Sequence, residues 1–229
     1  MPAPSTEDFF DAIRTGDQTR VRTLVEANPS LLSAKDSQGL GPFTIARYSR
    51  QNAIAEFLLT RGVELDIFAA CIAGRRDRVR ELLIEDATLI AAHSHDGWTP
   101  LHLAAFFNFP DVAADLLARG ADVHARSINA MRNTPLHAAV AGGSTAIART
   151  LLEHGADANA RQEGGWTPLH AAAQSGNIEI LQLLIDAGAT VRVPADNRQT
   201  PGDLALTRGH QGAVDILEKY GAFEASGHD

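Results

Sequence analysis

The sequence predicts an all-α protein built as an elongated array of stacked helical units, and three observations support this. A Thr-Pro-Leu-His string occurs three times and returns in altered form, with its threonines at 99, 134, 167 and 200 and therefore at nearly even spacing. An alanine-rich stretch and a second apolar stretch ending in glycine follow each of the three intact strings. A unit of this kind cannot bury its apolar face alone, so neighbouring units must stack.

Each Thr-Pro-Leu-His string is a predicted helix start. The threonine hydroxyl can accept a hydrogen bond from a free backbone N–H of the first turn, and proline suits the first helical position because it has no N–H to satisfy. Glycines at 143, 176 and 209 can end the first helix in a left-handed conformation. A second helix then carries apolar residues at helical spacing, such as Ile178, Leu181 and Leu184. About ten polar residues follow and predict an extended, turn-bearing finger.

The N-terminal half contains the same unit in a less regular form. Residues 12–62 can be laid on residues 70–120 at one constant offset without a gap, so that Gly16 matches Gly74 and Pro42 matches Pro100. This gives seven units in all. Their second-helix leucines lie at 24, 58, 82, 116, 151, 184 and 217.

The expected organisation is a single domain covering residues 1–229. The unit boundaries are approximate and are set by the repeating pattern. They are 5–38, 39–62, 63–96, 97–129, 130–163, 164–196 and 197–224, with a polar tail at 225–229.

The strings Asp96-Gly97-Trp98-Thr99-Pro100-Leu101-His102-Leu103-Ala104-Ala105 and Leu151-Leu152-Glu153-His154-Gly155-Ala156-Asp157-Ala158-Asn159-Ala160 resemble the ankyrin repeat family. The four C-terminal units match strongly, and the first three mainly through the internal offset. The resemblance implies a curved solenoid of antiparallel helix pairs with short β-hairpin fingers along one edge. It also implies protein–protein recognition through the finger tips and the inner helices.

The chain departs from this pattern at three places. The short step from Leu58 to Leu82 leaves no room for a finger, so we expect a gap in the row there. The finger at 127–132 is longer than its neighbours. In the last unit Gly202 replaces the inward leucine, as suits a unit that no later one packs against.

Composition and charge limit the class of partner. Apolar residues make up 45% of the chain, enough for a folded interior, and the low aromatic content of 6% suits closely packed helices. The net charge of −8 repels a phosphate backbone, so we expect no nucleic-acid partner. Cys71 is the single cysteine, and neither an export leader nor an apolar run of the roughly 20 residues that span a bilayer is present. We therefore expect no membrane association and a cytoplasmic location, and the scarcity of lysine indicates a GC-rich bacterial genome.

Candidate chemistry is sparse. His102, His137 and His170 are one repeat apart, roughly 10 Å, which is too far for a shared zinc ion, so hydrogen bonding within and between units is expected. His93, His95 and Asp96 lie close enough to share a metal, but structural zinc needs four ligands, and a solvated turn explains them equally well. Cys71 is expected to be a buried, inert thiol. We expect no enzyme, no cofactor and no metal.

An arginine cluster offers one alternative surface. Arg75, Arg76, Arg78 and Arg80 are interleaved with Asp77, Glu81, Glu85 and Asp86. The acidic neighbours interrupt any stripe that could follow phosphates, so a solvated helix face is favoured over nucleic-acid binding.

Large side chains where the architecture does not need them form the candidate partner-binding site. Aromatic anchors of this kind are typical of interfaces, although packing between fingers would explain the same residues. The candidate residues are His95, Asp96, Trp98, Phe106, Phe107, Met131, Asn133, Trp166, Gln174, Ser175 and Arg198.

Two functions follow from this site. The first is a non-catalytic module, monomeric when isolated, that binds another protein on its concave face. The alternative is a structural or regulatory subunit, or a chaperone-like solenoid, in an obligate complex. The isolated chain would then associate non-specifically or form dimers.

Overall fold

The computed structural model describes residues 5–223, and it is all-helical there, with no β-strand in that range. Fourteen α-helices form seven consecutive pairs in the described residues. The chain divides into two compact units, Met1–Asp86 and Ala87–Asp229, which are described separately below. The expected all-α solenoid is confirmed, while the expected single domain and its unit boundaries stay predictions.

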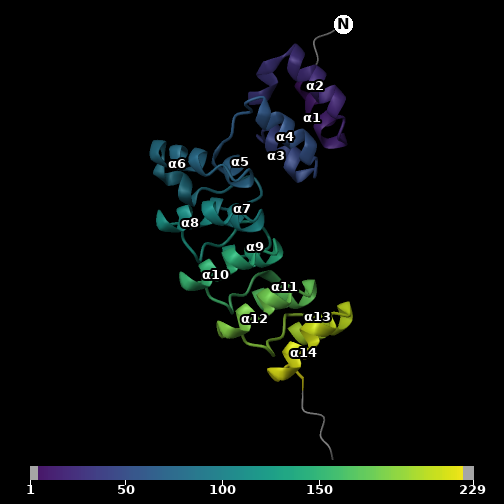
Figure 1. The fold of residues 1–229 in the computed structure, drawn as a ribbon, viewed down its shortest axis with the longest axis vertical. Coiled ribbons are helices and arrows are strands. Elements are labelled where there is room, and N and C mark those ends of the chain that lie inside the picture. Colours follow the sequence, from purple (N-terminus) through teal and green to yellow (C-terminus); the bar gives the residue numbers. More distant parts are fainter. Residues whose placement is uncertain (1–4, 224–229) are drawn as a thin grey trace, which may run out of the picture. The chain divides into compact units, whose positions relative to one another are not determined.

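The first compact unit, Met1–Asp86, holds three helix pairs. The first helices of the pairs pack in the order α1, α3, α5, and α2 packs against α4 in a second layer (Figure 1). The elements are α1 (Thr6–Thr15), α2 (Gln18–Ala27), the 3-10 helix η1 (Pro29–Ser33), α3 (Pro42–Tyr48), α4 (Asn52–Thr60), α5 (Ile67–Ile72) and α6 (Arg76–Glu85).

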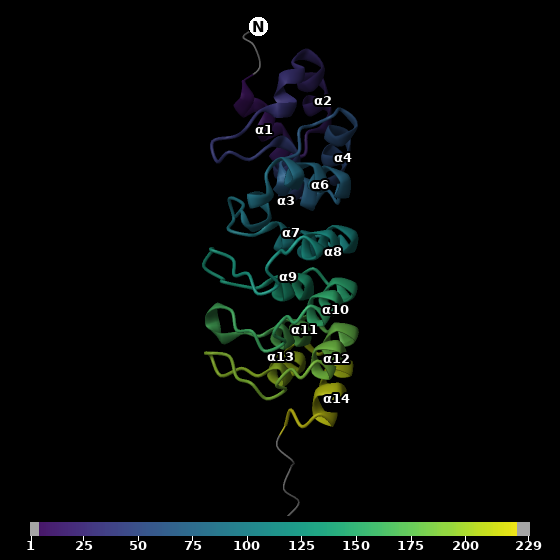
Figure 2. The same cartoon turned by 90° about the vertical axis from the view of Figure 1, so that its left-hand side faces the viewer.

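The second compact unit, Ala87–Asp229, holds four helix pairs in two layers. Figure 2 shows α9, α11 and α13 between the outer helices and a row of loops that project to one side. Each first helix packs against the next first helix, and each second helix against the next second helix. The elements are η2 (Ala87–Ala91), α7 (Pro100–Phe106), α8 (Pro110–Ala118), α9 (Pro135–Ala141), α10 (Thr145–Glu153), η3 (Glu163–Gly165), α11 (Pro168–Ser175), α12 (Ile178–Asp186), α13 (Pro201–Arg208) and α14 (Gln211–Lys219).

The predicted helix starts are confirmed. Thr99, Thr134, Thr167 and Thr200 are N-caps in extended conformation, and the proline after each begins the helix. Glycine ends the first helix in a left-handed conformation at Gly176 (φ 69°) and Gly209 (φ 71°). Alanines and leucines line the interface between successive first helices, and Leu136 is fully buried there.

The internal offset found in the sequence appears in the helix boundaries themselves. Four elements that begin in the first compact unit have counterparts of the same length, each displaced along the chain by that one offset. The matched pairs are Gln18–Ala27 with Arg76–Glu85, Pro29–Ser33 with Ala87–Ala91, Pro42–Tyr48 with Pro100–Phe106, and Asn52–Thr60 with Pro110–Ala118.

The fingers differ in detail from regular β-hairpins. Each is a short turn with one closing backbone hydrogen bond and a second one inside it. In one of them, Ser94 N–H donates to the Trp98 carbonyl (2.8 Å) and Gly97 N–H donates to the Ser94 carbonyl (2.9 Å). Turns this short leave no length for a ladder, so no strand forms there. The long finger runs from Ser127 to Asn133, closed by the bond from Ser127 N–H to the Asn133 carbonyl (2.9 Å), which confirms its extra length.

The missing finger is also confirmed. Only residues 61–66 connect α4 to α5, and they hold neither a 3-10 turn nor a finger. The second-helix leucines are buried at 24, 58, 116, 151, 184 and 217, but Leu82 is half-buried. Val79 and Leu83 form the buried face of α6 instead, and a pocket lies between the start of α6 and the end of α4.

Phe223 covers the gap that Gly202 leaves. A Cβ at Gly202 would lie 2.8 Å from the Phe223 ring, so the ring occupies the space of the missing leucine side chain. The expected polar tail at 225–229 lies outside the described residues.

Replacing Phe223 with alanine should therefore uncover the buried backbone at Gly202. We expect the free energy of unfolding to fall by about 2 kcal/mol, less than for a fully buried phenylalanine because the ring is only half-buried. Urea unfolding followed by circular dichroism measures this change. The matched control is Leu206→Ala. Leu206 lies on α13, as Gly202 does, but its side chain is 53% exposed, so this variant should change stability little. Equal effects of the two variants would contradict the capping role.

Candidate functional site

Three buried histidines join successive repeats of the second compact unit. His102 Nδ1 lies 2.8 Å from the Thr99 hydroxyl, and Nε2 lies 3.0 Å from the Asn133 carbonyl oxygen at the end of the next finger. His137 reaches the Trp166 carbonyl (3.3 Å), and His170 reaches the Gln199 carbonyl (3.2 Å) in the same way. The expected bonding within and between units is confirmed.

The geometry also fixes the charge state of these histidines. A carbonyl oxygen only accepts, so Nε2 carries the proton and Nδ1 accepts from the threonine N–H and hydroxyl. Burial lowers the pKa of His102 and of His137 to about 4, because desolvation disfavours the imidazolium, and it also lowers the pKa of His170. The three rings are therefore neutral at pH 7, and both nitrogens of each are engaged.

The fingers of the second compact unit are linked to one another by backbone hydrogen bonds. Ile128 N–H donates to the Gly97 carbonyl, Glu163 N–H to the Met131 carbonyl, and Asp196 N–H to the Gly164 carbonyl, each at 2.9 Å. Asn129 Nδ2 adds a bond to the Asp96 carbonyl (2.9 Å). The row is thus held rigidly before any partner arrives, which reduces the entropy lost on binding.

Three of the predicted aromatic residues form one cluster. The Trp98 and Phe106 rings meet edge to face with centroids 5.2 Å apart, and Phe106 meets Phe107 in the same way at 5.3 Å. Trp98 also lies against the His102 ring at 5.9 Å. Trp98 is half-buried between its finger and α7, while Phe106 at the end of α7 is 37% exposed. The cluster therefore both packs and presents an apolar edge.

The long finger presents two exposed apolar side chains. Met131 is 49% exposed, as a binding residue would be, and Ile128 is 70% exposed. Sequence reasoning did not select Ile128 as a site residue. The available signal was an isoleucine in a finger that is longer than its neighbours. Its Cγ1 lies 3.0 Å from the position of a Cβ on Gly97, next to Trp98.

The C-terminal candidates lie one or two repeats further along. Trp166 is half-buried against His170, with ring centroids 5.6 Å apart. Ser175 is exposed at the end of α11, and Arg198 is exposed on the last finger with a left-handed φ of 67°. The Gln174 carbonyl accepts from His210 Nε2 (3.1 Å), which ties it to the scaffold.

Of the remaining candidates, one is exposed on the surface and two make hydrogen bonds within the fingers. His95 is exposed on its finger, while Asp96 accepts a hydrogen bond from the Ser94 hydroxyl within the turn. Asn133 is only 8% exposed and supports the finger, because its N–H donates to the Ser127 hydroxyl (3.0 Å). No group of three His, Cys, Asp or Glu side chains within residues 5–223 is arranged to hold a metal ion.

The alternative chemical candidates take structural roles. Cys71 is fully buried in α5, and burial raises the pKa of its thiol, so the expected inert thiol is confirmed. In the arginine cluster Arg78 pairs with Glu81 (3.1 Å), and Arg80 with Asp77 (3.8 Å). These pairs bear out the interleaving of acidic and basic side chains on α6.

Family models describe most of the second compact unit. The model for three copies of ankyrin repeats matches residues 124–195 and 159–225, and the single ankyrin repeat model matches residues 96–128. The chain belongs to the ankyrin repeat family. Ankyrin repeats generally mediate protein–protein interaction.

Similar proteins share the ankyrin repeats over part of their length. The chain is 44% identical over 54 residues to ankyrin repeat domain-containing protein 49 of Homo sapiens, covering 24% of this chain and 23% of that protein. It is 41% identical over 119 residues to protein phosphatase 1 regulatory subunit 27 of Homo sapiens, covering 52% and 61%. It is 30% identical over 114 residues to alpha-latrocrustotoxin-Lt1a of Latrodectus tredecimguttatus, covering 46% and 8%. The chain thus spans less than two thirds of each relative.

Among the described helices of this ankyrin repeat chain, none is both long and apolar enough to cross a membrane. The expected bacterial origin stays a prediction, since the relatives named above are eukaryotic.

Proposed function

We propose that this chain is a non-catalytic protein-binding module whose partner docks on the concave face of the second compact unit. We call the contact area the finger face and define it by Trp98, Phe106, Ile128 and Met131. The observation that carries the proposal is that Phe106, Ile128 and Met131 are exposed although each is large and apolar. Exposed apolar anchors on a rigid frame are the usual centre of an interface.

The contacts tie these residues to one row of linked fingers. Ile128 lies against Gly97, the adjoining Trp98 meets Phe106, and Phe106 meets Phe107. Met131 is held to the next finger through its carbonyl bond with Glu163. A protein partner suits this face better than a nucleic acid does, because the chain carries a net charge of −8. A monomeric state when isolated and a cytoplasmic location belong to the same proposal.

A triple variant tests the finger face. Phe106→Ser, Ile128→Ser and Met131→Ser together remove the exposed apolar side chains but leave the Trp98 contact with His102 and the Asn133 hydrogen bond to Ser127. Proteins that the wild type captures from a lysate of its native organism should be lost with the variant, by more than tenfold if one anchor contributes about 1.4 kcal/mol or more. Mass spectrometry identifies and quantifies them.

The matched control is Ile84→Ser, at an isoleucine that is 75% exposed on α6 in the other compact unit. It removes one exposed apolar side chain outside the finger face and should retain every captured protein. Circular dichroism confirms that both variants fold. If the triple variant and the control capture the same proteins in equal amounts, the finger face is not the docking site.

The second candidate is a regulatory subunit of an obligate complex, and the similarity to protein phosphatase 1 regulatory subunit 27 favours it. Such a chain would use the same finger face permanently. Sedimentation of the isolated chain separates the two candidates. A monomer favours the binding module, whereas self-association that the triple variant abolishes favours the obligate subunit.

A further inference from the structure

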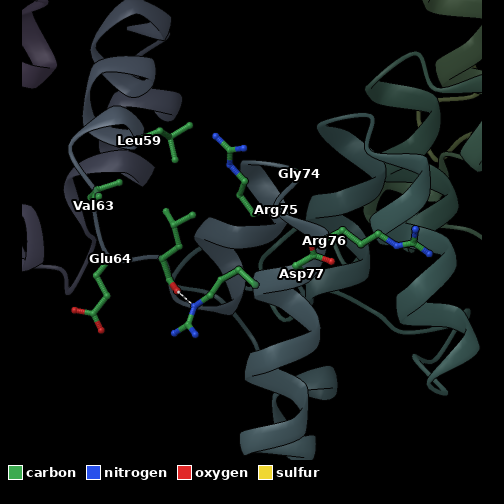
Figure 3. A pocket seen from close by; sticks show the side chains of 10 residues that line it. Leu59, Val63, Glu64, Gly74, Arg75, Arg76 and Asp77 are labelled. Carbon is green, nitrogen blue, oxygen red and sulfur yellow. Dashed lines mark hydrogen bonds between the residues drawn. The ribbon is translucent and has the colours of Figure 1, made fainter.

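The missing finger leaves an open pocket inside the first compact unit. It has a volume of about 830 Å³ and lies between the end of α4, the connection to α5 and the start of α6. Figure 3 shows Leu59 and Val63 on one side and the Arg75 side chain reaching toward them from the other. Ligand pockets typically have volumes of about 300–1,000 Å³, so this pocket has room for a few side chains.

The floor of the pocket is apolar. Leu59 is half-buried, and Val63 and Leu65 are 7% and 9% exposed. Earlier in this unit, α2 packs against α4. Here the short connection holds α5 close to α3 while the start of α6 stands away from α4. The apolar side chains at the end of α4 therefore face the pocket.

The rim of the pocket carries an excess of positive charge. Three arginines at 75, 76 and 78 and two carboxylates at Glu64 and Asp77 line it, which leaves a formal charge of +1 in a chain whose net charge is −8. Arg78 is fixed by a bond from Nε to the Leu65 carbonyl (3.3 Å) and pairs with Glu81 (3.1 Å) and Glu85 (4.0 Å). The positive charge available to a ligand at the rim is therefore that of Arg75. Arg75 is exposed and makes no ion pair with the described residues.

We propose that this pocket binds a short acidic peptide segment of a partner protein, with one apolar side chain of the segment seated on Leu59, Val63 and Leu65. Arg75 pairs with a carboxylate next to that apolar side chain. A guanidinium forms two parallel hydrogen bonds with a carboxylate, which gives the contact both strength and direction. The site is separate from the finger face, because all of its lining residues belong to Met1–Asp86.

Charge complementarity selects this occupant. An acidic segment is repelled by most of a chain of charge −8, so only a locally basic site attracts it, and the attraction weakens with salt. The apolar floor adds a requirement that a purely ionic site lacks. Both features must be present in a ligand that binds well.

The test uses the full chain and a fluorescein-labelled peptide, Asp-Glu-Asp-Leu-Leu-Asp-Glu, with fluorescence anisotropy as the measurement. We expect saturable binding that weakens with added salt. Arg75→Glu should weaken binding roughly tenfold or more by replacing attraction with repulsion, and Leu59→Asp should do the same through the floor. Arg75→Lys keeps the charge but loses the paired hydrogen bonds of the guanidinium, so its affinity should lie between those of the wild type and Arg75→Glu.

Two controls make the outcome specific. Arg119→Glu reverses an exposed arginine of the second compact unit and should leave binding unchanged, as should the finger-face triple variant. A peptide with glycine in place of both leucines should bind at least tenfold more weakly. Circular dichroism checks that every variant folds.

Three outcomes would overturn the proposal. The first is equal affinity of wild type and Arg75→Glu. The second is equal affinity for the leucine and glycine peptides, which would indicate general electrostatic attraction. The third is self-association of the chain that Arg75→Glu abolishes and the peptide does not compete with, which would assign the pocket to a second copy. Loss of finger-face binding alone would leave this site intact.

Discussion

Acidification from pH 7 to pH 4 should lower the free energy of unfolding of the second compact unit by about 3 kcal/mol for each of His102 and His137. Burial lowers both pKa values from 6.5 to about 4, and each pKa unit corresponds to about 1.4 kcal/mol. In this window the unfolded chain binds a proton at each histidine and the folded chain does not. Stability is therefore fully present above pH 6.5 and is lost as the pH falls toward 4.

Urea unfolding at a series of pH values measures this effect. His102→Gln and His137→Gln should each reduce the slope of unfolding free energy against pH by up to about 1.4 kcal/mol per pH unit between the two pKa values. The exposed His124 provides the control, and His124→Gln should leave the slope unchanged. If the variants at His102 and His137 show the wild-type slope, the histidines are not protonation-linked to folding.

Adding one methyl group at Gly142 should destabilise the second compact unit by about 3 kcal/mol. A Cβ there would overlap with the Phe106 carbonyl oxygen and lie 2.8 Å from its carbonyl carbon. The obstacle is the backbone of α7, which cannot rotate away as a side chain can, so Gly142→Ala must separate α9 from α7. Because Phe106 is part of the finger face, the same variant should also weaken partner binding.

Gly212→Ala is the matched control for this substitution. It adds the same methyl group in α14, where the Cβ would meet the Cδ1 of Ile178 at 2.7 Å, the far end of an exposed side chain that can move. Alanine is also favoured over glycine in a helix by about 1 kcal/mol. Thermal or urea unfolding should therefore rank Gly212→Ala at or above wild type and Gly142→Ala well below it. The opposite ranking would refute the close approach at Phe106.

The sequence predicts the repeating part of this fold well, because the repeat itself encodes it. Thr99 and Pro100 fix where α7 begins, and the constant internal offset predicts the matching boundaries in the weaker N-terminal units. The role of His102 also follows from its repetition, since a residue that recurs at every joint serves the architecture.

The candidate site is less predictable, because exposure depends on what lies beside a residue in space. Trp98 and Asn133 look alike as finger residues in the sequence, but one shares an apolar edge with Phe106 and the other supports the turn from beneath. Ile128 is 70% exposed on the long finger, and its sequence neighbours do not reveal this. The pocket at Arg75 lies where the finger between α4 and α5 is missing. Sequence motifs indicate which residues are present, but they do not indicate where a cavity is left open.

The histidine joint has a consequence for how such a chain grows. In each joint, the Nε2–H of a histidine in one repeat donates to the last backbone carbonyl of the next finger. The side chain of the residue that supplies this carbonyl takes no part in the bond, so Asn133, Trp166 and Gln199 serve equally. A gene duplication that inserts one more repeat therefore supplies a complete joint at both of its edges. Surface residues can then diverge freely in each copy, so length and binding specificity can evolve independently of each other.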